Sequence, residues 1–136
     1  LLPLGYDPKQ RTFFILEGVV MYVVEPGNAA TFDFIRANSA PGSVVVYDYV
    51  LKDVIQGKAK RYYGAAYLVY TVERLGEPFI FGWTPAEAAA WAKKRGFQVV
   101  EDVDHAKLGR RHLTRTNGKL DGRVMDWQRI IEARVP

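Results

Sequence analysis

The chain has no cysteine, which excludes disulfide frameworks and metal sites built from thiolates. No apolar run approaches the roughly 20 residues that are needed to span a bilayer. The N-terminus also lacks the basic start of a signal peptide. We therefore expect no membrane association and a cytoplasmic location. With 136 residues, 49% of them hydrophobic and 25% charged, the chain fits a single domain with one core.

Sequence motifs of several enzyme classes are missing as well. The chain has no glycine-rich phosphate-binding loop, no G-x-S-x-G nucleophile elbow and no H-E-x-x-H zinc motif. Hydrolase and nucleotide-triphosphatase activities therefore have no support. His105 and His112 lie seven residues apart in a basic stretch without a third ligand, so we expect no metal site.

The charge is moderately basic, with a net charge of +4 and a pI near 9.4. The basic residues are scattered except in Lys58 to Arg61 and Lys107 to Arg115. Arg110, Arg111 and Arg115 could meet an anionic substrate, although a solvated face is the simpler interpretation. No recognisable binding motif accompanies the charge, so nucleic-acid binding is unlikely on the sequence and ranks as a third possibility. It would predict salt-dependent retention on duplex DNA.

The stretch from Arg11 to Val23 contains the most informative pattern. An apolar run, Phe13 to Leu16, leads directly into Glu17 and Gly18. Such a run predicts a strand covered on both faces, as in a parallel sheet with helices above and below. Ligands of open α/β sheets collect beyond the carboxyl ends of the strands, where a glycine lets them approach the backbone. Glu17 is therefore placed to touch a ligand.

The rest of the chain alternates between predicted strands and helices. Strands are predicted over Thr12 to Glu17, Val44 to Tyr49, Phe97 to Val103 and Trp127 to Val135. The first two are joined by a helix and should be parallel, so Glu17 and Asp48 should share one edge of the sheet. The last two are joined without a crossover helix, which predicts an antiparallel pair.

Helix signals vary in strength along the chain. Thr84-Pro85-Ala86-Glu87 is a capping box that predicts a helix over Pro85 to Arg95. Weaker signals predict an extended entry over Leu1 to Gln10, a helix over Ala29 to Asn38 capped by Asn28, a helical stretch over Leu51 to Leu75 and a helical turn over Ala106 to Leu113. Because Gly57 and Gly64 weaken a continuous helix, the sequence predicts two helices with a bend over Leu51 to Leu75 as readily as one helix.

Three segments of the chain also match a known family. GYDPKQRTFFILEGVVMYV, SAPGSVVVYDYV and GEPFIFGWTPAEAAAWAKKRGFQVVED resemble the leucine carboxyl methyltransferase family in order and spacing. This family is a branch of the S-adenosylmethionine-dependent methyltransferases. The resemblance implies an α/β fold, the C-terminal half of a class I (Rossmann-like) methyltransferase sheet. That half has about four strands flanked by helices, with the last strand antiparallel and placed between its neighbours.

The resemblance also implies an activity. It is transfer of a methyl group from S-adenosylmethionine to an oxygen, foremost a carboxylate of a small molecule or a peptide end. Glu17, beside Gly18, would lie against the cofactor, and Tyr22 would orient the substrate carboxylate. Purely structural alternatives exist, since Glu17 could cap the following helix and Tyr22 could pack at the sheet edge. The carboxylate nucleophile is already ionised, so the enzyme would mainly align it and exclude water.

Two further groups have weaker functional readings. The tyrosines between Tyr62 and Tyr70 could wall a substrate pocket, because the family inserts lid helices here, and Tyr63 and Tyr67 would then touch the substrate. Core packing is the simpler interpretation of such a stripe. Asp48 and Tyr49 end a strand, where a structural role is the simpler interpretation.

The resemblance starts just before the fourth strand of the family's sheet, so the glycine-rich cofactor loop has no counterpart here. We therefore interpret residues 1–136 as one partial methyltransferase domain, the C-terminal portion of a longer enzyme and inactive alone. The outer edge of the strand at Phe13 would be bare, which predicts a homodimer or binding of the missing half. The alternative is a non-catalytic α/β binding or interaction module, dimeric through the exposed strand edge.

Overall fold

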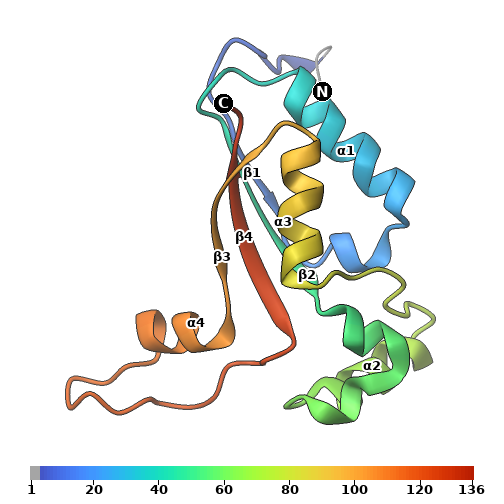
Figure 1. Ribbon diagram of the computed structural model, residues 1–136, viewed down its shortest axis with the longest axis vertical. Helices are drawn as coiled ribbons and strands as arrows, with labels where there is room; N and C mark the ends of the chain where they lie inside the picture. Colours follow the sequence, from blue (N-terminus) through green and yellow to red (C-terminus); the bar gives the residue numbers. More distant parts are fainter. Residues whose placement is uncertain (1–3) are drawn as a thin grey trace.

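A mixed sheet of four strands runs through the computed structural model, which describes residues 4–136 (Figure 1). β1 (Phe13–Leu16) pairs in parallel with β2 (Val44–Val50). β4 (Gln128–Arg134) lies between β2 and β3 (Gln98–Val103) and is antiparallel to both, which makes the order β1-β2-β4-β3. The predicted strands, the parallel first pair and the antiparallel last pair are confirmed.

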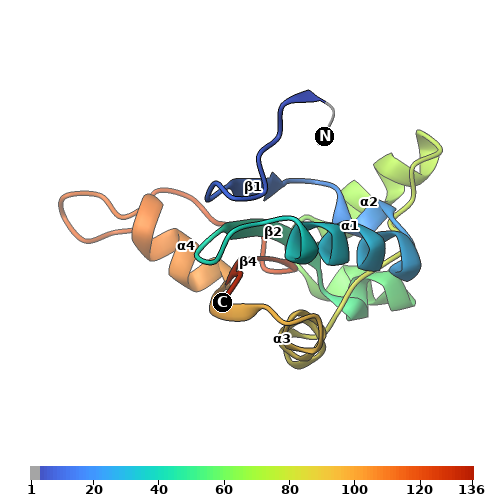
Figure 2. The same ribbon diagram turned by 90° about the horizontal axis from the view of Figure 1, so that it is seen from above.

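Two helices, α1 (Glu25–Ala37) and α3 (Pro85–Lys94), cover one face of this sheet (Figure 2). The main core lies between them and the strands and is dominated by aromatic and β-branched side chains. Phe32 of α1 packs edge-to-face on Tyr47 of β2, with ring centroids 4.8 Å apart. Ala88 and Ala92 of α3 are fully buried, so this helix approaches the sheet closely through small residues.

The opposite face of the sheet is open near β1. Phe13 is 61% and Ile15 63% exposed, whereas Phe14 and Leu16 pack against the core. The prediction that this strand is covered on both faces is therefore wrong for the described chain. Successive residues of a strand point to opposite faces, and α1 and α3 cover only the face away from Phe13 and Ile15.

The first helix begins earlier than predicted. A short 3₁₀ turn, η2 (Val20–Tyr22), precedes α1, whose N-cap is Val24. The assignment of Asn28 as N-cap is wrong, because Asn28 lies within the helix and is buried. Its side-chain amide donates to the carbonyl oxygens of Val20 at 3.0 Å and Val23 at 2.8 Å. Asn28 thus ties the turn after β1 to the helix.

The segment from Leu51 to Leu75 is not one helix. It contains an irregular helical segment that is kinked at Gln56 and Gly57, η3 (Val54–Lys58), a 3₁₀ turn, η4 (Ala59–Arg61), and α2 (Ala65–Arg74). Gly57 and Gly64 have φ values of +80° and +75°, a region that a side chain disfavours, and they mark the two breaks. The bent alternative is confirmed.

The remaining local predictions have different outcomes. The capping box of Thr84 and Glu87 is formed at the start of α3, and α4 (His105–His112) replaces the predicted helical turn. The predicted extended entry is wrong for residues 4–10, which lie mostly in turns, and residues 1–3 lie outside the described residues. Within residues 4–136, no helix has the length and apolar character that a membrane crossing requires.

Candidate functional site

The candidate site lies where β1 and β2 end. The parallel register places Leu16 opposite Tyr47, so the next residues, Glu17 and Asp48, follow at the same edge. Both carboxylates line one cavity, as the strand–helix–strand pattern predicts. This edge is the place at which open α/β sheets bind ligands.

Asp48 is the buried acid of the pair, with 7% of its surface exposed. One carboxylate oxygen accepts the Gly18 N–H at 2.7 Å, and the other accepts the side-chain amide of Gln128. Gly18 has a φ of +65°, a backbone conformation that glycine adopts readily. Asp48 thus holds the turn at Gly18. The carboxylate therefore connects the ends of β1 and β2 with the start of β4, as a structural role predicts.

Glu17 is the exposed acid of the pair. Within residues 4–136 no hydrogen bond or ion pair engages its carboxylate, and the Gly18 backbone beside it is open. A Cβ built on Gly18 would meet no atom within 4 Å. Helix capping by Glu17 is not observed, since the N-caps of η2 and α1 have no side-chain bond. The site thus combines a free carboxylate with an accessible stretch of backbone.

Tyr22 lies in η2, half-buried next to this edge. Its ring packs on Phe79 with centroids 5.3 Å apart. Burial, and then the carboxylates of Glu77 and Asp48, raise the pKa of the Tyr22 hydroxyl above its usual value. The hydroxyl is therefore protonated at neutral pH and can donate a hydrogen bond at the rim of the site.

Glu17 and Asp48 line a cavity of about 380 Å³ that opens on the face of the sheet carrying Ile15. Tyr22 does not line this cavity and packs in the second core cluster instead. The walls of the cavity are mostly apolar and its polar groups are Glu17, Asp48 and Gln128. The apolar wall comes from the sheet, from α4 and from the segment before β4: Ile15, Leu16, Val46, Tyr47, Leu108, Val124, Met125 and Ile130. An apolar cavity with a few convergent polar groups is the usual form of a small-molecule site.

Gln128 is the site residue that sequence reasoning missed. It begins β4, and the antiparallel pairing with β2 places it opposite Val50 and near Asp48. An amide at the start of a strand has no signal of its own in the sequence. The predicted antiparallel pairing of the last strand does not locate Gln128 near Asp48 unless the register between β2 and β4 is also known.

The two tyrosines predicted to touch substrate do not line this cavity. Tyr67 is 76% and Tyr63 49% exposed, so the interpretation of both as core is wrong as well. Tyr63 packs instead against the segment before β4, where the Arg123 guanidinium lies 4.3 Å from its ring centroid. Tyr67 lies on α2 and Tyr63 in the turn before it, and neither ring belongs to a core cluster.

Tyr49 and the histidines lie away from the candidate site. The Tyr49 hydroxyl is directed to the covered side, where it donates to Asp102 at 2.9 Å, and burial raises its pKa. Asp102 also accepts from Arg129 at 2.9 Å, so these three groups form a structural network. His105 and His112 are exposed on α4. Among residues 4–136 no group of three potential His, Cys, Asp or Glu ligands is placed to hold a metal ion.

Comparison with known proteins identifies the fold. No protein-family model and no curated protein sequence matches the chain. A solved structure of a DUF574 family protein from Streptomyces avermitilis matches 98% of this chain over 48% of its own length, with a TM-score of 0.62 and 14% identity. An S-adenosylmethionine-dependent methyltransferase from Thermotoga maritima, described as a possible histamine N-methyltransferase, matches 97% and 56%, with a TM-score of 0.56 and 12% identity.

A methyltransferase of the same cofactor class from Methanosarcina mazei matches 95% of the chain and 60% of its own, with a TM-score of 0.53 and 12% identity. The chain thus spans about half the length of these structures. Its mixed sheet and flanking helices are those of a Rossmann-like methyltransferase fold of class I.

Proposed function

We propose that the chain is the C-terminal part of an S-adenosylmethionine-dependent methyltransferase and contributes one half of the catalytic site. The observation that carries the proposal is the shared edge at which Glu17 and Asp48 meet an apolar cavity, in a sheet of methyltransferase order. The similar structures described as S-adenosylmethionine-dependent methyltransferases support the choice of reaction.

The residues present fit part of such a cofactor. Glu17 has a carboxylate without a partner in the described chain, next to the open backbone of Gly18. S-adenosylmethionine would supply a methyl group on a positively charged sulfur, and it also carries a cationic amino group. We assign Glu17 to hold a cationic group of the cofactor, while Gly18 lets the ligand approach the chain.

For the acceptor we propose an oxygen, foremost a carboxylate of a small molecule or a peptide end. The resemblance of the chain to leucine carboxyl methyltransferases suggests this choice. Tyr22 is protonated at neutral pH and could donate a hydrogen bond that orients the acceptor. A carboxylate needs no general base, so alignment and exclusion of water would be the main contributions of the protein.

We further propose that β1 and the open face receive a second folding unit. β1 pairs only with β2 among the described strands, and Phe13 and Ile15 are uncovered beside its bare edge. An apolar edge strand recruits a partner strand. The partner is the missing half of the enzyme or, in its absence, a second copy of the chain.

Isothermal calorimetry with S-adenosylmethionine tests the proposal. We expect little binding to the 136-residue chain and binding to a longer protein in which the proposed N-terminal half is restored upstream of it. Glu17→Ala in the longer protein should weaken binding about tenfold, the equivalent of roughly 1.4 kcal/mol for one charged contact. Glu73→Ala on the exposed side of α2 is the matched control and should leave the affinity unchanged. A longer protein that does not bind the cofactor would contradict the proposal.

A non-catalytic interaction module is the second candidate, and the exposed tyrosines favour it. Tyr67 and Tyr70 of α2 present large rings to solvent, which is typical of contact surfaces. Under this function, Tyr67→Ala should weaken binding of the partner while the longer protein shows no affinity for the cofactor. Calorimetry on the longer protein therefore separates the two functions.

A further inference from the structure

The strongest charge feature of the molecule lies on the segment that also supplies Leu108, Val124 and Met125 to the candidate cavity. Residues 105–126 contain six lysines and arginines against two aspartates, an excess that equals the net charge of +4 of all 136 residues. This segment comprises α4 and the long loop before β4, and it projects from the end of the sheet (Figure 1). The chain therefore concentrates its positive charge on one projecting arm.

Acidic neighbours neutralise this arm only in part. Lys107 and Arg111 share a single carboxylate oxygen of Glu101, at 3.2 Å and 2.6 Å. Arg110 and Lys119 are exposed and have no ion pair among the described residues. Arg115 pairs with Asp121 at 2.5 Å and Arg123 with Asp126 at 2.9 Å. Arg110 and Lys119 are therefore the two cations of the arm that are available to an anionic ligand among the described residues.

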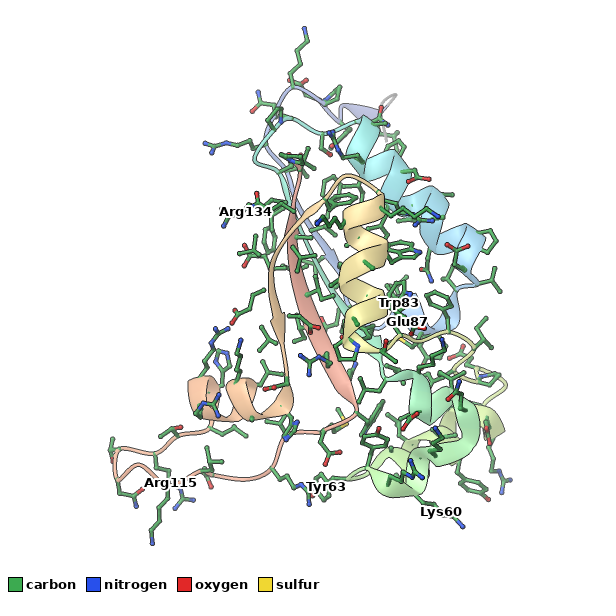
Figure 3. The ribbon with its side chains drawn as sticks, viewed as in Figure 1. Lys60, Tyr63, Trp83, Glu87, Arg115 and Arg134 are labelled. Carbon is green, nitrogen blue, oxygen red and sulfur yellow. The ribbon has the colours of Figure 1, made fainter. Side chains whose placement is uncertain are left out.

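The tertiary structure joins this arm to the second basic cluster, Lys58 to Arg61. The Tyr63 N–H donates to Asp126 at 2.8 Å, and the Tyr63 carbonyl oxygen accepts the Trp127 indole N–H at 3.0 Å. Arg123 stacks on the Tyr63 ring, as described above. Lys60, Tyr63 and Arg115 consequently lie along one end of the molecule (Figure 3).

Exposed aromatic rings accompany the cations along this end. Tyr67 on α2 is 76% exposed, and Tyr63 is 49% exposed with the Arg123 guanidinium over its ring. Cations that neutralise phosphates, together with open rings on which bases stack, are the two components of sites for single-stranded nucleic acid. An acidic protein would need the cations alone, and a duplex would offer no free base to the rings.

We propose that this end of the molecule binds single-stranded RNA or DNA. We name it the basic rim and define it by Lys60, Tyr63, Tyr67, Arg110, Arg115, Lys119 and Arg123. Arg110 and Lys119 contact phosphates, and Tyr67 stacks on a base. The inference does not depend on methyl transfer, because it uses no residue assigned to the cofactor or the acceptor.

Fluorescence anisotropy of a labelled oligouridylate tests the proposal. The binding constant K of the full chain is measured at several salt concentrations. Each phosphate contact with a single strand contributes about 0.7 to the slope of log K against log salt. We expect the double variant Arg110→Gln/Lys119→Gln to reduce the slope by about 1.4. The control Lys93→Gln/Lys94→Gln changes the charge equally at the end of α3 and should leave the slope unchanged.

The contribution of stacking is measured separately. Tyr67→Ala should weaken binding at least about fivefold, and Tyr67→Phe should restore it, because stacking needs the ring and not the hydroxyl. Tyr67 is exposed, so the variants should fold, which circular dichroism can verify. Absence of binding at about 50 mM salt would overturn the proposal. An equal reduction of the salt slope in the control double variant would also overturn it. The same holds if Tyr67→Ala binds the oligonucleotide as tightly as the native chain and heparin displaces the oligonucleotide as well as unlabelled RNA does.

Discussion

Asp48 and Glu17 occupy the same edge but have different environments. Asp48 is buried and uses both oxygens within the protein, whereas Glu17 is exposed and uses neither among the described residues. A buried carboxylate is tolerated only when donors surround it, so Asp48 is committed to the fold. Glu17 remains available for a ligand, and the two acids should therefore respond to substitution in different assays.

Substitution of Asp48 should affect stability. Asp48→Asn keeps the shape but places an amide group against two donors, the Gly18 N–H and the Gln128 side chain. We expect the free energy of unfolding in urea to fall by about 1–3 kcal/mol, the cost of leaving a buried group unsatisfied. Asp33→Asn on exposed α1 is the control. A loss no greater than in that control would show that Asp48 does not hold the turn.

At the scale of elements, the start of α3 depends on Glu87. Its carboxylate accepts from Lys52 and from the Thr84 N–H at 2.8 Å, and these bonds lower its pKa from 4.5 to about 2, with Lys52 the larger cause. A lowered pKa means that ionised Glu87 stabilises the folded state above pH 4.5. This stabilisation is lost as the pH falls from 4.5 toward about 2.

The pH dependence of Tm in the native protein and in Glu87→Gln measures this contribution. We expect the native protein to melt higher than the variant at neutral pH, and the difference to shrink as the pH falls through this window. A difference that does not vary with pH would contradict the assignment. The gap should also narrow in salt, because Lys52 and Glu87 are both partly exposed.

The segment before α3 is packed closely against the end of β2. A Cβ added at Gly82 would lie 2.6 Å from the Val50 carbonyl oxygen and 3.0 Å from the Ile55 side chain. Because the backbone of β2 cannot move away, Gly82→Ala should lower the free energy of unfolding by about 1–3 kcal/mol.

The control for this prediction is Gly27→Ala in α1. Its Cβ would meet a side-chain atom of Val23 at the same distance of 2.6 Å, but that side chain can rotate. Alanine is also the better helix former, so we expect little loss or a small gain in stability. Urea unfolding of both variants separates the two cases, and equal stability changes would argue against a fixed contact at Val50.

At the scale of the whole molecule, the open face and the bare edge of β1 predict self-association. We expect sedimentation equilibrium of the isolated chain to show a dimer at millimolar concentration. Ile15→Lys should weaken the dimer, since a charged residue protects an edge strand from pairing. Val24→Lys adds the same charge at another exposed apolar residue and should have no effect. A chain that stays monomeric with β1 facing solvent would contradict the proposal.

The sequence alone determined the features that depend on neighbouring residues. The apolar runs predicted the strands, and the Thr84 to Glu87 capping box predicted the start of α3, because these signals act within a few residues. The shared edge of Glu17 and Asp48 was also predicted, because the two strands of a strand–helix–strand unit are usually parallel and end at the same edge of the sheet.

Only the tertiary structure decided which faces are covered and which distant groups meet. The contact of Gln128 with Asp48 and the packing of Tyr63 on Arg123 join residues 80 and 60 positions apart. The exposed side of β1 depends on a layer that the described chain does not supply. Asn28 illustrates the same limit. Its side chain could cap a helix or donate to the preceding turn, and only the tertiary structure shows that it lies inside the helix and donates to Val20 and Val23. Short-range patterns specify an element, but burial depends on what the rest of the chain places above it.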